Sequence, residues 1–172
     1  ALGKLLLAFS TATRSIVAQY PAKILTIDKD DFSFGHSLNI GCAPATGDFL
    51  VFASAHVYPL YVDWIAQLVH PFEDDRIACV YGRQVGNDAT RFSERQVFAR
   101  WFPGQSDMNQ NHPFCNNANA AVRQSVWKRF RYDETLTGLE DLAWARQVLS
   151  AGFRIAYKAD AEVVHVHQET RD

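Results

Sequence analysis

The sequence has few of the features that tie a chain together covalently. Among its 172 residues it has three cysteines, Cys42, Cys79 and Cys115, which lie far apart and form no CxxC pair. An odd number of widely spaced cysteines argues against a disulfide framework, and the spacing does not suggest a zinc ribbon. We therefore expect three reduced thiols, as in cytosolic proteins.

Long apolar runs and a strong net charge are also missing. The apolar stretches fall well short of the ~18–20 residues that a membrane-spanning helix requires. The opening residues, ALGKLLLAF, lack a signal-peptide cleavage pattern, so we expect a cytoplasmic protein. The formal net charge of −2 gives no electrostatic reason to bind nucleic acid or an anionic membrane.

What the sequence does contain is the alternation of short apolar runs and longer polar segments that is typical of α/β domains. We expect strands at residues 22–27, 48–53 and 77–82, and helices at residues 14–19, 34–45 and 63–70. Two of the strands show little apolar/polar alternation, which favours a mostly parallel sheet covered on both faces. The length suits a single domain over residues 1–172.

The second half is less regular. We expect loops and one helix, at residues 93–102, within the polar and aromatic stretch 83–113. Helices at 123–130 and 140–151 follow, with Gly152 in the position of a C-cap glycine, and short strands at 153–157 and 161–167 finish the chain.

The N-terminal end has an irregular order of elements. Residues 2–9 are typical of a helix, yet Ser10-Thr11-Ala12-Thr13 predicts a new helix start. An open α/β domain normally has a strand between two such helices. The chain is therefore either shortened there or lacks residues between Phe9 and Ser10, and we favour missing residues.

A small polar tripeptide, Ser54-Ala55-His56, follows directly after the apolar strand at 48–53. In open α/β sheets, ligands bind outside the carboxyl ends of the strands. Ser54 is able to hydrogen-bond a phosphate or a sugar hydroxyl, and His56 to bind a metal or donate to phosphate. The alternative is a strand that simply leaves the core, with His56 in solvent.

Two carboxylates, Glu140 and Asp141, stand at the start of the helix at 140–151, just after Gly138. An ionised carboxylate at a helix N-terminus is favoured by the helix dipole, so capping alone explains the pair. The functional alternative is that one of them accepts a proton from an attacking hydroxyl.

Further candidates come from histidines and amides. His165 and His167 alternate on one face of the last strand, where they would bind one metal or form an exposed edge pair. The side chains of Asn116, Asn117 and Asn119 suit either sugar hydroxyls or turns and caps.

Four segments, taken in their order along the chain, resemble a family 2 glycosyltransferase with the GT-A fold. They are SFGHSLNIGCAPATGDFLVF, SAH, FCNNANAAVRQSVW and GLEDLAWARQVLSAGFRIAYKADAEVVH. The resemblance runs from about Ser10 to His167, and residues 10–13 look like the segment after the strand that binds the nucleotide base. It implies a Rossmann-like three-layer sandwich. It also implies inverting transfer of a sugar from a UDP or dTDP sugar to a glycan or lipid-linked acceptor hydroxyl, in bacterial glycan or surface polysaccharide synthesis. Such acceptors would bring the protein to the inner face of the membrane as a peripheral protein.

The resemblance also assigns roles. Asp141 matches the catalytic base, with Glu140 supporting it or contacting the acceptor. The donor would be bound by Asn39, Ser54, Ala55 and His56, and the acceptor by Asn117, Asn119 and Arg123. A metal or the diphosphate would meet His165 together with His56.

One departure from the family pattern concerns the metal. Ser54-Ala55-His56 stands where most members carry Asp-x-Asp, as in a subset of bacterial members, and hard cations such as Mg²⁺ or Mn²⁺ prefer oxygen ligands. Three outcomes follow: a weaker metal site using His56 and His165, metal-free stabilisation of the diphosphate, or an inactive relative. An inactive nucleotide-sugar or carbohydrate-binding module and a nucleotidyltransferase are the rival classes.

Overall fold

The computed structural model describes residues 4–7, as backbone, and residues 15–166. The helices are α2 (Phe34–Cys42), α3 (Trp64–Val69), α4 (Phe92–Trp101), α5 (Gln124–Arg129) and α6 (Glu140–Ser150), with 3-10 turns η1 (Lys29–Asp31) and η2 (His70–Glu73). The strands are β1 (Lys4–Leu7), β2 (Ala22–Leu25), β3 (Phe49–Ala53), β4 (Val57–Pro59), β5 (Ile77–Val85), β6 (Asp107–Gln110), β7 (Asn119–Arg123) and β8 (Arg154–His165).

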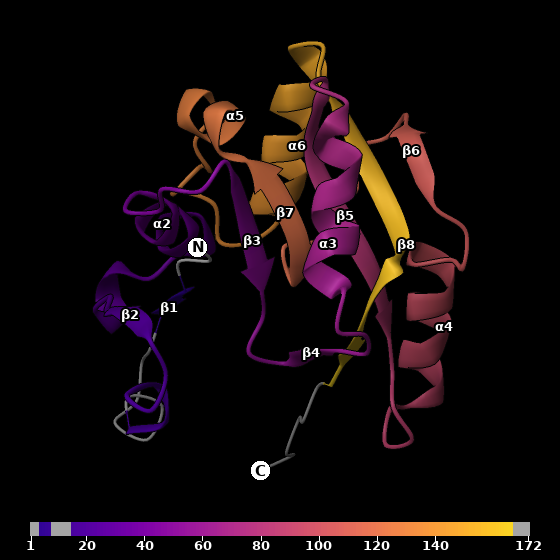
Figure 1. Ribbon diagram of the computed structural model, residues 1–172, viewed down its shortest axis with the longest axis horizontal. Coiled ribbons are helices and arrows are strands. Elements are labelled where there is room, and N and C mark those ends of the chain that lie inside the picture. The colour runs from indigo at the N-terminus through magenta and orange to yellow at the C-terminus, as the bar shows by residue number, and fades with distance from the viewer. Residues whose placement is uncertain (1–3, 8–14, 167–172) are drawn as a thin grey trace.

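Six of these strands form the central sheet. Its order is β3-β7-β5-β8-β4, and β6 pairs with β8 as well. The strands β5 and β8 are parallel, while β7 runs antiparallel between β3 and β5. The carboxyl ends of β3, β5 and β8 therefore point to one edge of the sheet, the lower edge in Figure 1.

The expectation of a mostly parallel sheet needs correction, because the described sheet is mixed. Strand β7 and the short strands β4 and β6 all pair antiparallel. The sequence does not predict these strands, because β4 and β6 have only three and four residues and β7, NAAVR, is a short run that directly follows the amide-rich segment.

Helices cover both faces of the sheet, as a three-layer arrangement requires. On one face, Trp64 and Leu68 of α3 and Phe72 of η2 pack on apolar residues of β5, β7 and β8. Helices α2, α4, α5 and α6 contribute to a larger core on the other face, where Trp127 and Trp144 are almost fully buried. Figure 1 shows α3 in front of the sheet and α6 behind it. The α/β sandwich predicted from the sequence is confirmed.

A separate two-stranded sheet lies beside α2. It is made of β1 and β2, which pair in parallel from Lys4↔Ala22 to Leu7↔Leu25. The expected helix at 2–9 is therefore wrong for residues 4–7, because this leucine run pairs with β2 as a strand. The expected helix start at residues 10–13 and the suspected gap between Phe9 and Ser10 lie outside the described residues.

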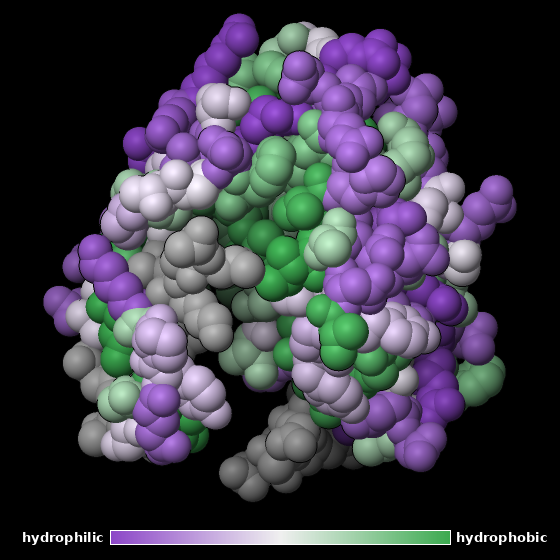
Figure 2. All heavy atoms as spheres, in the orientation of Figure 1, coloured by the Kyte–Doolittle hydropathy of each residue, from purple (hydrophilic) through white to green (hydrophobic). Residues whose placement is uncertain are grey.

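An apolar surface is exposed where β3 borders α3. Figure 2 shows apolar side chains gathered at the centre of this face. Phe49 and Val51 of β3 and Ile65 and Val69 of α3 are partly buried residues that pack on the α3-side core.

None of the described helices has the length and apolar character needed to cross a membrane.

Most other expected elements are confirmed within a few residues, including the helices at 93–102 and 140–151. Gly152 has a left-handed φ of 88°, and the N–H of Phe153 donates to the carbonyl of Val148, which completes the helix end expected there. The two short strands expected at the end form one strand, β8, with a register shift where Gly82 and Gln84 of β5 oppose Lys158 and Val163.

The three cysteines are buried free thiols, as expected. Burial raises the pKa of Cys42 to about 12. A hydrogen bond with Cys79, together with burial, raises the pKa of Cys115. Cys42 and Cys115 therefore stay protonated at neutral pH and serve as core residues rather than nucleophiles.

Candidate functional site

The tripeptide Ser54-Ala55-His56 forms a turn at the carboxyl end of β3. The N–H of Ser54 donates to the carbonyl of Ala118 at 3.0 Å, and the N–H of Val57 returns to the carbonyl of Ser54 at 3.2 Å. Ala55 and His56 are exposed, and the hydroxyl of Ser54 accepts from the N–H of His56 at 3.3 Å. The strand therefore ends in exposed polar groups at the sheet edge, as the sequence predicts.

His165, at the end of β8, lies next to this turn. Val57 of β4 is the Cα partner of His165, and the carbonyl of His56 accepts from the N–H of Val166 at 2.9 Å. The ring of His165 is stacked on Phe98 of α4, and the residue is 8% exposed. His56 and His165, which are far apart in sequence, thus meet at the same edge. His167 lies outside the described residues.

The loop before β7 joins this edge to the acidic end of α6. Asn117 donates from its side-chain amide to Glu140 at 3.5 Å and accepts from the hydroxyl of Tyr132 at 3.3 Å. Its backbone N–H also hydrogen-bonds the carboxylate of Asp141. Because Ala118, the next residue, holds Ser54, one short segment connects Asp141 to the turn after β3.

Asp141 sits in an environment that favours its neutral form. Burial and the neighbouring charge of Glu140 raise its pKa, against hydrogen bonds from the backbone N–H groups of Leu142 and Asn117. Glu140 itself is only 8% exposed. A carboxylate with a raised pKa that is still partly exposed is suited to accept a proton at neutral pH.

The backbone before α6 is strained at a leucine. Leu139, the residue that precedes the helix, has a φ of 61° and a side chain that is 70% exposed. A left-handed conformation costs a non-glycine residue of the order of 1 kcal/mol. Gly138, the residue before it, has open space around it, but the unusual φ falls on Leu139.

The assignment of Asn119 to acceptor binding needs correction. Its side chain is fully buried, accepts from the indole N–H of Trp64 at 2.8 Å and donates to the carbonyls of Ala161 at 2.8 Å and Arg83 at 3.1 Å. A methyl group on Gly82 would lie 2.4 Å from this amide, which shows how closely the sheet packs around it. Asn119 therefore links β7, β5, β8 and α3, and has no surface for an acceptor.

Arg123 also lies at the wrong end of β3 for the acceptor binding expected of it. It pairs with Phe49 at the start of β3, so it lies ~13 Å along the strand from the turn after Ala53. Its guanidinium donates to the carbonyls of Phe72 and Ile77. The sequence does not show this, because nothing in NAAVR indicates a strand that runs away from the site.

Asn39, expected at the donor, is buried in the helix-covered core. Its amide donates to the carbonyl of Tyr132 and to Glu134, and its oxygen accepts from the indole N–H of Trp127 and the N–H of Tyr132. These four bonds use the hydrogen-bonding capacity of the amide and fasten α2 to the segment before α6. A contact with the donor stays a prediction.

A metal has few protein ligands at this edge. Among residues 15–166, no three His, Cys, Asp or Glu side chains group so that they would hold a metal ion. His56 and His165 supply two imidazoles, whereas Mg²⁺ and Mn²⁺ prefer oxygen. The described side chains do not fit an all-protein cation site, so we derive no chemical step through a metal.

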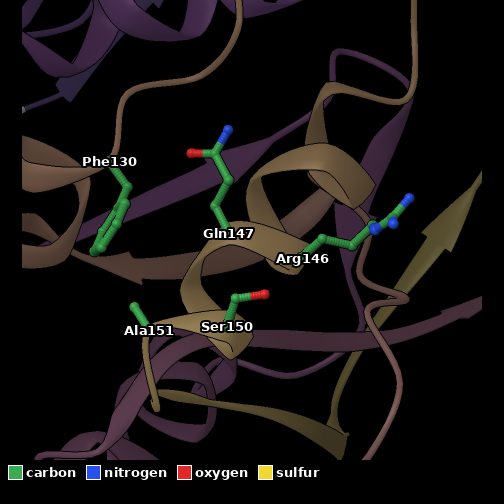
Figure 3. Close-up of a pocket in the computed structure, with 5 residues that line it drawn as sticks. All are labelled: Phe130, Arg146, Gln147, Ser150 and Ala151. Carbon is green, nitrogen blue, oxygen red and sulfur yellow. The ribbon is translucent and has the colours of Figure 1, made fainter.

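The depression in Figure 3 lies away from these groups. It is lined by Phe130 and by residues of the second half of α6 and its end, namely Arg146, Gln147, Ser150 and Ala151. Asp141 is nine residues before Ser150 on this helix, which corresponds to ~13 Å. The depression has a different position from the edge formed by β3, β4 and β8.

Comparison with known proteins identifies the sequence pattern. Residues 10–131 match the model of the family described as Glycosyl transferase family 2. Over 161 residues the chain is 31% identical to the O-antigen chain rhamnosyltransferase RfbN of Salmonella typhimurium, covering 86% of this chain and 50% of that protein. It is 29% identical over 172 residues to WbaN of Salmonella anatum, also an O-antigen chain rhamnosyltransferase, covering 92% of this chain and 54% of that protein. The chain thus spans about half the length of these relatives.

Solved structures support the fold. The mannosyltransferase PcManGT from Pyrobaculum calidifontis, in complex with GDP-Man and Mn²⁺, matches with a TM-score of 0.73 and 17% identity, over 97% of this chain and 48% of that one. The expected GT-A fold is confirmed by this likeness, which at such low identity is a statement about fold alone.

Proposed function

Since the chain belongs to glycosyl transferase family 2, we propose that it transfers a sugar, with inversion, from a nucleotide-diphosphate sugar to a hydroxyl of a bacterial glycan. The observation that carries the proposal is the single segment, Asn117-Ala118, that joins Asp141 to the turn at Ser54. A deoxyhexose such as rhamnose, carried on dTDP or UDP, is the first donor to test, because both curated relatives are named rhamnosyltransferases.

In the proposed mechanism the acceptor hydroxyl attacks the anomeric carbon while Asp141 takes its proton. The raised pKa of Asp141 makes its carboxylate a stronger base and brings that pKa closer to the pKa of the acceptor hydroxyl. The amide of Asn117 donates to Glu140, which would support Asp141 or contact the acceptor. The C–O bond to the leaving diphosphate breaks as the new glycosidic bond forms, and the diphosphate leaves with the electron pair.

The leaving diphosphate would lie at the turn after β3. Ser54 and His56 supply a hydroxyl and an imidazole there, and donors aimed at growing negative charge lower the barrier. In PcManGT, Mn²⁺ accompanies GDP-Man. For this chain we propose that the diphosphate is held by Ser54 and His56, and that any cation takes most of its ligands from the diphosphate oxygens.

The pH dependence of transfer follows from the position of Asp141. Because its pKa is raised above the ordinary 3.8, the ionised base is lost at a higher pH than for a solvated aspartate. We expect the acid limb of the kcat/KM profile to be shifted upward accordingly. Profiles measured with a saturating acceptor test this. An acid limb centred at or below the ordinary value would contradict the assignment of Asp141.

Replacing His56 by alanine is expected to weaken donor use by roughly tenfold, as the loss of one charge-assisted hydrogen bond to the diphosphate would do. The measurement is kcat/KM for the donor, together with the dissociation constant of the nucleoside diphosphate. His70→Ala is the matched control, because His70 is exposed and pairs with Glu73 in η2. Equal values for the two variants would leave His56 as a solvated turn residue.

A thermal-shift screen of sugar nucleotides tests the proposed function itself. We expect at least one dTDP or UDP sugar to raise the melting temperature, because a ligand that binds only the folded state stabilises it. Repeating each assay with Mn²⁺ and with EDTA measures the metal requirement directly. If no sugar nucleotide stabilises the protein and none is consumed with glycan acceptors, the proposal is wrong. Binding without turnover would instead indicate an inactive sugar-nucleotide module.

A further inference from the structure

A chain of side-chain hydrogen bonds leads from His165 to the segment that holds the end of β3. It runs from His165 through Gln84 of β5 to Asn116, with distances of 2.6 Å and 3.0 Å. We propose that Gln84 is a positioning residue that fixes which ring nitrogen of His165 carries the proton, and that Asn116 sets the orientation of Gln84.

The direction of the chain is fixed at its far end by a backbone group. The N–H of Ala118 lies 2.9 Å from the Oδ1 position of Asn116. A backbone N–H only donates, so the side-chain atom of Asn116 that faces it has to be the oxygen. The same oxygen faces the side chain of Gln84. Gln84 therefore has to present its NH₂ group to Asn116, since its own oxygen could not donate.

The orientation of Gln84 then determines the tautomer of His165. With its NH₂ group on Asn116, Gln84 turns its Oε1 toward Nδ1 of His165. A carbonyl oxygen only accepts, so Nδ1 has to carry a hydrogen. In the neutral ring the lone pair then belongs to Nε2, and the Nε2–H tautomer is disfavoured.

Burial strengthens this preference. Gln84 is 1% exposed and His165 is 8% exposed, so water has little access to replace the bond between them. The ring of Phe98, stacked on His165 at a centroid distance of 6.0 Å, limits its rotation. In an interior of low dielectric constant, a buried acceptor without a donor is costly.

The role that this tautomer would give His165 at the donor rests on the proposed function. A neutral His165 with the lone pair on Nε2 would accept a hydrogen bond from a hydroxyl of the donor. The segment that orients Gln84 also holds Ser54 through the carbonyl of Ala118. One loop would therefore set both the turn after β3 and the acceptor nitrogen of His165.

Nitrogen-15 NMR of the histidine rings tests the tautomer without any assay of transfer. Spectra are recorded at about pH 9, well above the usual histidine pKa of about 6.5, so that the rings are neutral. The signals of His165 are identified by their loss in His165→Gln. We expect the Nδ1–H tautomer to predominate. A predominant Nε2–H tautomer would overturn the inference.

Two variants separate the effect of the hydrogen bond on the tautomer ratio from the effect of packing. Gln84→Met keeps a side chain of similar length but removes the acceptor, and should shift the tautomer ratio toward Nε2–H by roughly fivefold. Asn116→Asp keeps an oxygen facing Ala118 and Gln84, and should retain the ratio. Amide spectra and melting curves verify that both variants are folded. An unchanged ratio in Gln84→Met, or the same shift in Asn116→Asp, would contradict the chain as described.

Transfer gives a second, independent result. Loss of an outer-shell partner commonly costs about 10–100-fold in activity, so Gln84→Met should lower kcat/KM for the donor by that range. If the tautomer shifts but transfer stays normal, His165 is not used at the donor. If the wild-type protein transfers no sugar at all, the proposed function fails while the tautomer result stands.

Discussion

Replacing Asp141 by asparagine is expected to lower sugar transfer by on the order of 10²–10⁴-fold, the usual contribution of a general base. Asparagine keeps the shape of the side chain and an oxygen for the N–H groups of Leu142 and Asn117, but it cannot take the proton of the acceptor. The measurement is the rate of nucleoside diphosphate release with acceptor present. Binding of the nucleotide should remain within about twofold, since no donor contact is removed.

Stability provides the folding control for this variant. The folded-state pKa of Asp141 is raised, so its contribution to stability is present below the unfolded-state pKa and is lost as the pH rises through the folded-state value. At neutral pH the ionised group opposes folding, and Asp141→Asn should melt at or above the wild-type temperature. Glu73→Gln, in exposed η2, should leave transfer unchanged. Substantial turnover by Asp141→Asn would remove the assigned base.

Replacing Asn119 by alanine is expected to destabilise the fold by about 3–5 kcal/mol. The change leaves the buried indole N–H of Trp64 and the carbonyls of Arg83 and Ala161 without their partner, at about 1–3 kcal/mol for each unsatisfied group. At ~2–4 °C per kcal/mol for a chain of this size, the melting temperature should fall by ~10 °C. Thermal or urea unfolding measures the effect.

Asn117→Ala is the matched control in the same segment. Asn117 is only half-buried, so its replacement should change stability by about 1 kcal/mol or less. It removes the contact with Glu140 but keeps the backbone N–H on Asp141, so transfer should fall with a modest change in melting. If Asn119→Ala melts like wild type and instead raises the KM for the acceptor, the corrected role of Asn119 is wrong.

The most predictable parts of the site are the end of one strand and the start of one helix. An apolar run that closes in Ser54-Ala55-His56, and a helix that opens in Glu140-Asp141, are local signals because each depends on residues next to one another. Both lie where the sequence places them. The order of motifs along the chain carried the family resemblance, which the match over residues 10–131 confirms.

The roles of the amides were not predictable in the same way. Asn116, Asn117 and Asn119 are equivalent in the sequence, yet Asn119 is a buried link between strands and Asn117 faces the carboxylates. The difference arises because Asn119 begins β7, which is paired with β3 and β5, whereas Asn117 lies in the turn before that strand. The five residues of β7, NAAVR, give too short an apolar pattern from which to infer such pairing.

The apolar face of α6 shows a smaller difference of the same kind. The sequence suggests Leu142, Ala145 and Leu149 as the inward face, whereas the residues buried there are Trp144, Ala145 and Val148. Glu140 is buried as well, one turn before Trp144. The burial of Glu140 does not follow from an apolar pattern, since its side chain is charged.

The central claim is that the nucleotide binds at the edge formed by the last residues of β3 and β8 and the first residue of β4. An NMR titration of the backbone amides with the sugar nucleotide that stabilises the protein most is the most direct test. We expect the largest shifts at Ser54–His56, at His165 and at the Asn117 and Asp141 amides. Shifts centred on the depression lined by Arg146, Gln147 and Ser150, with the edge undisturbed, would contradict the account.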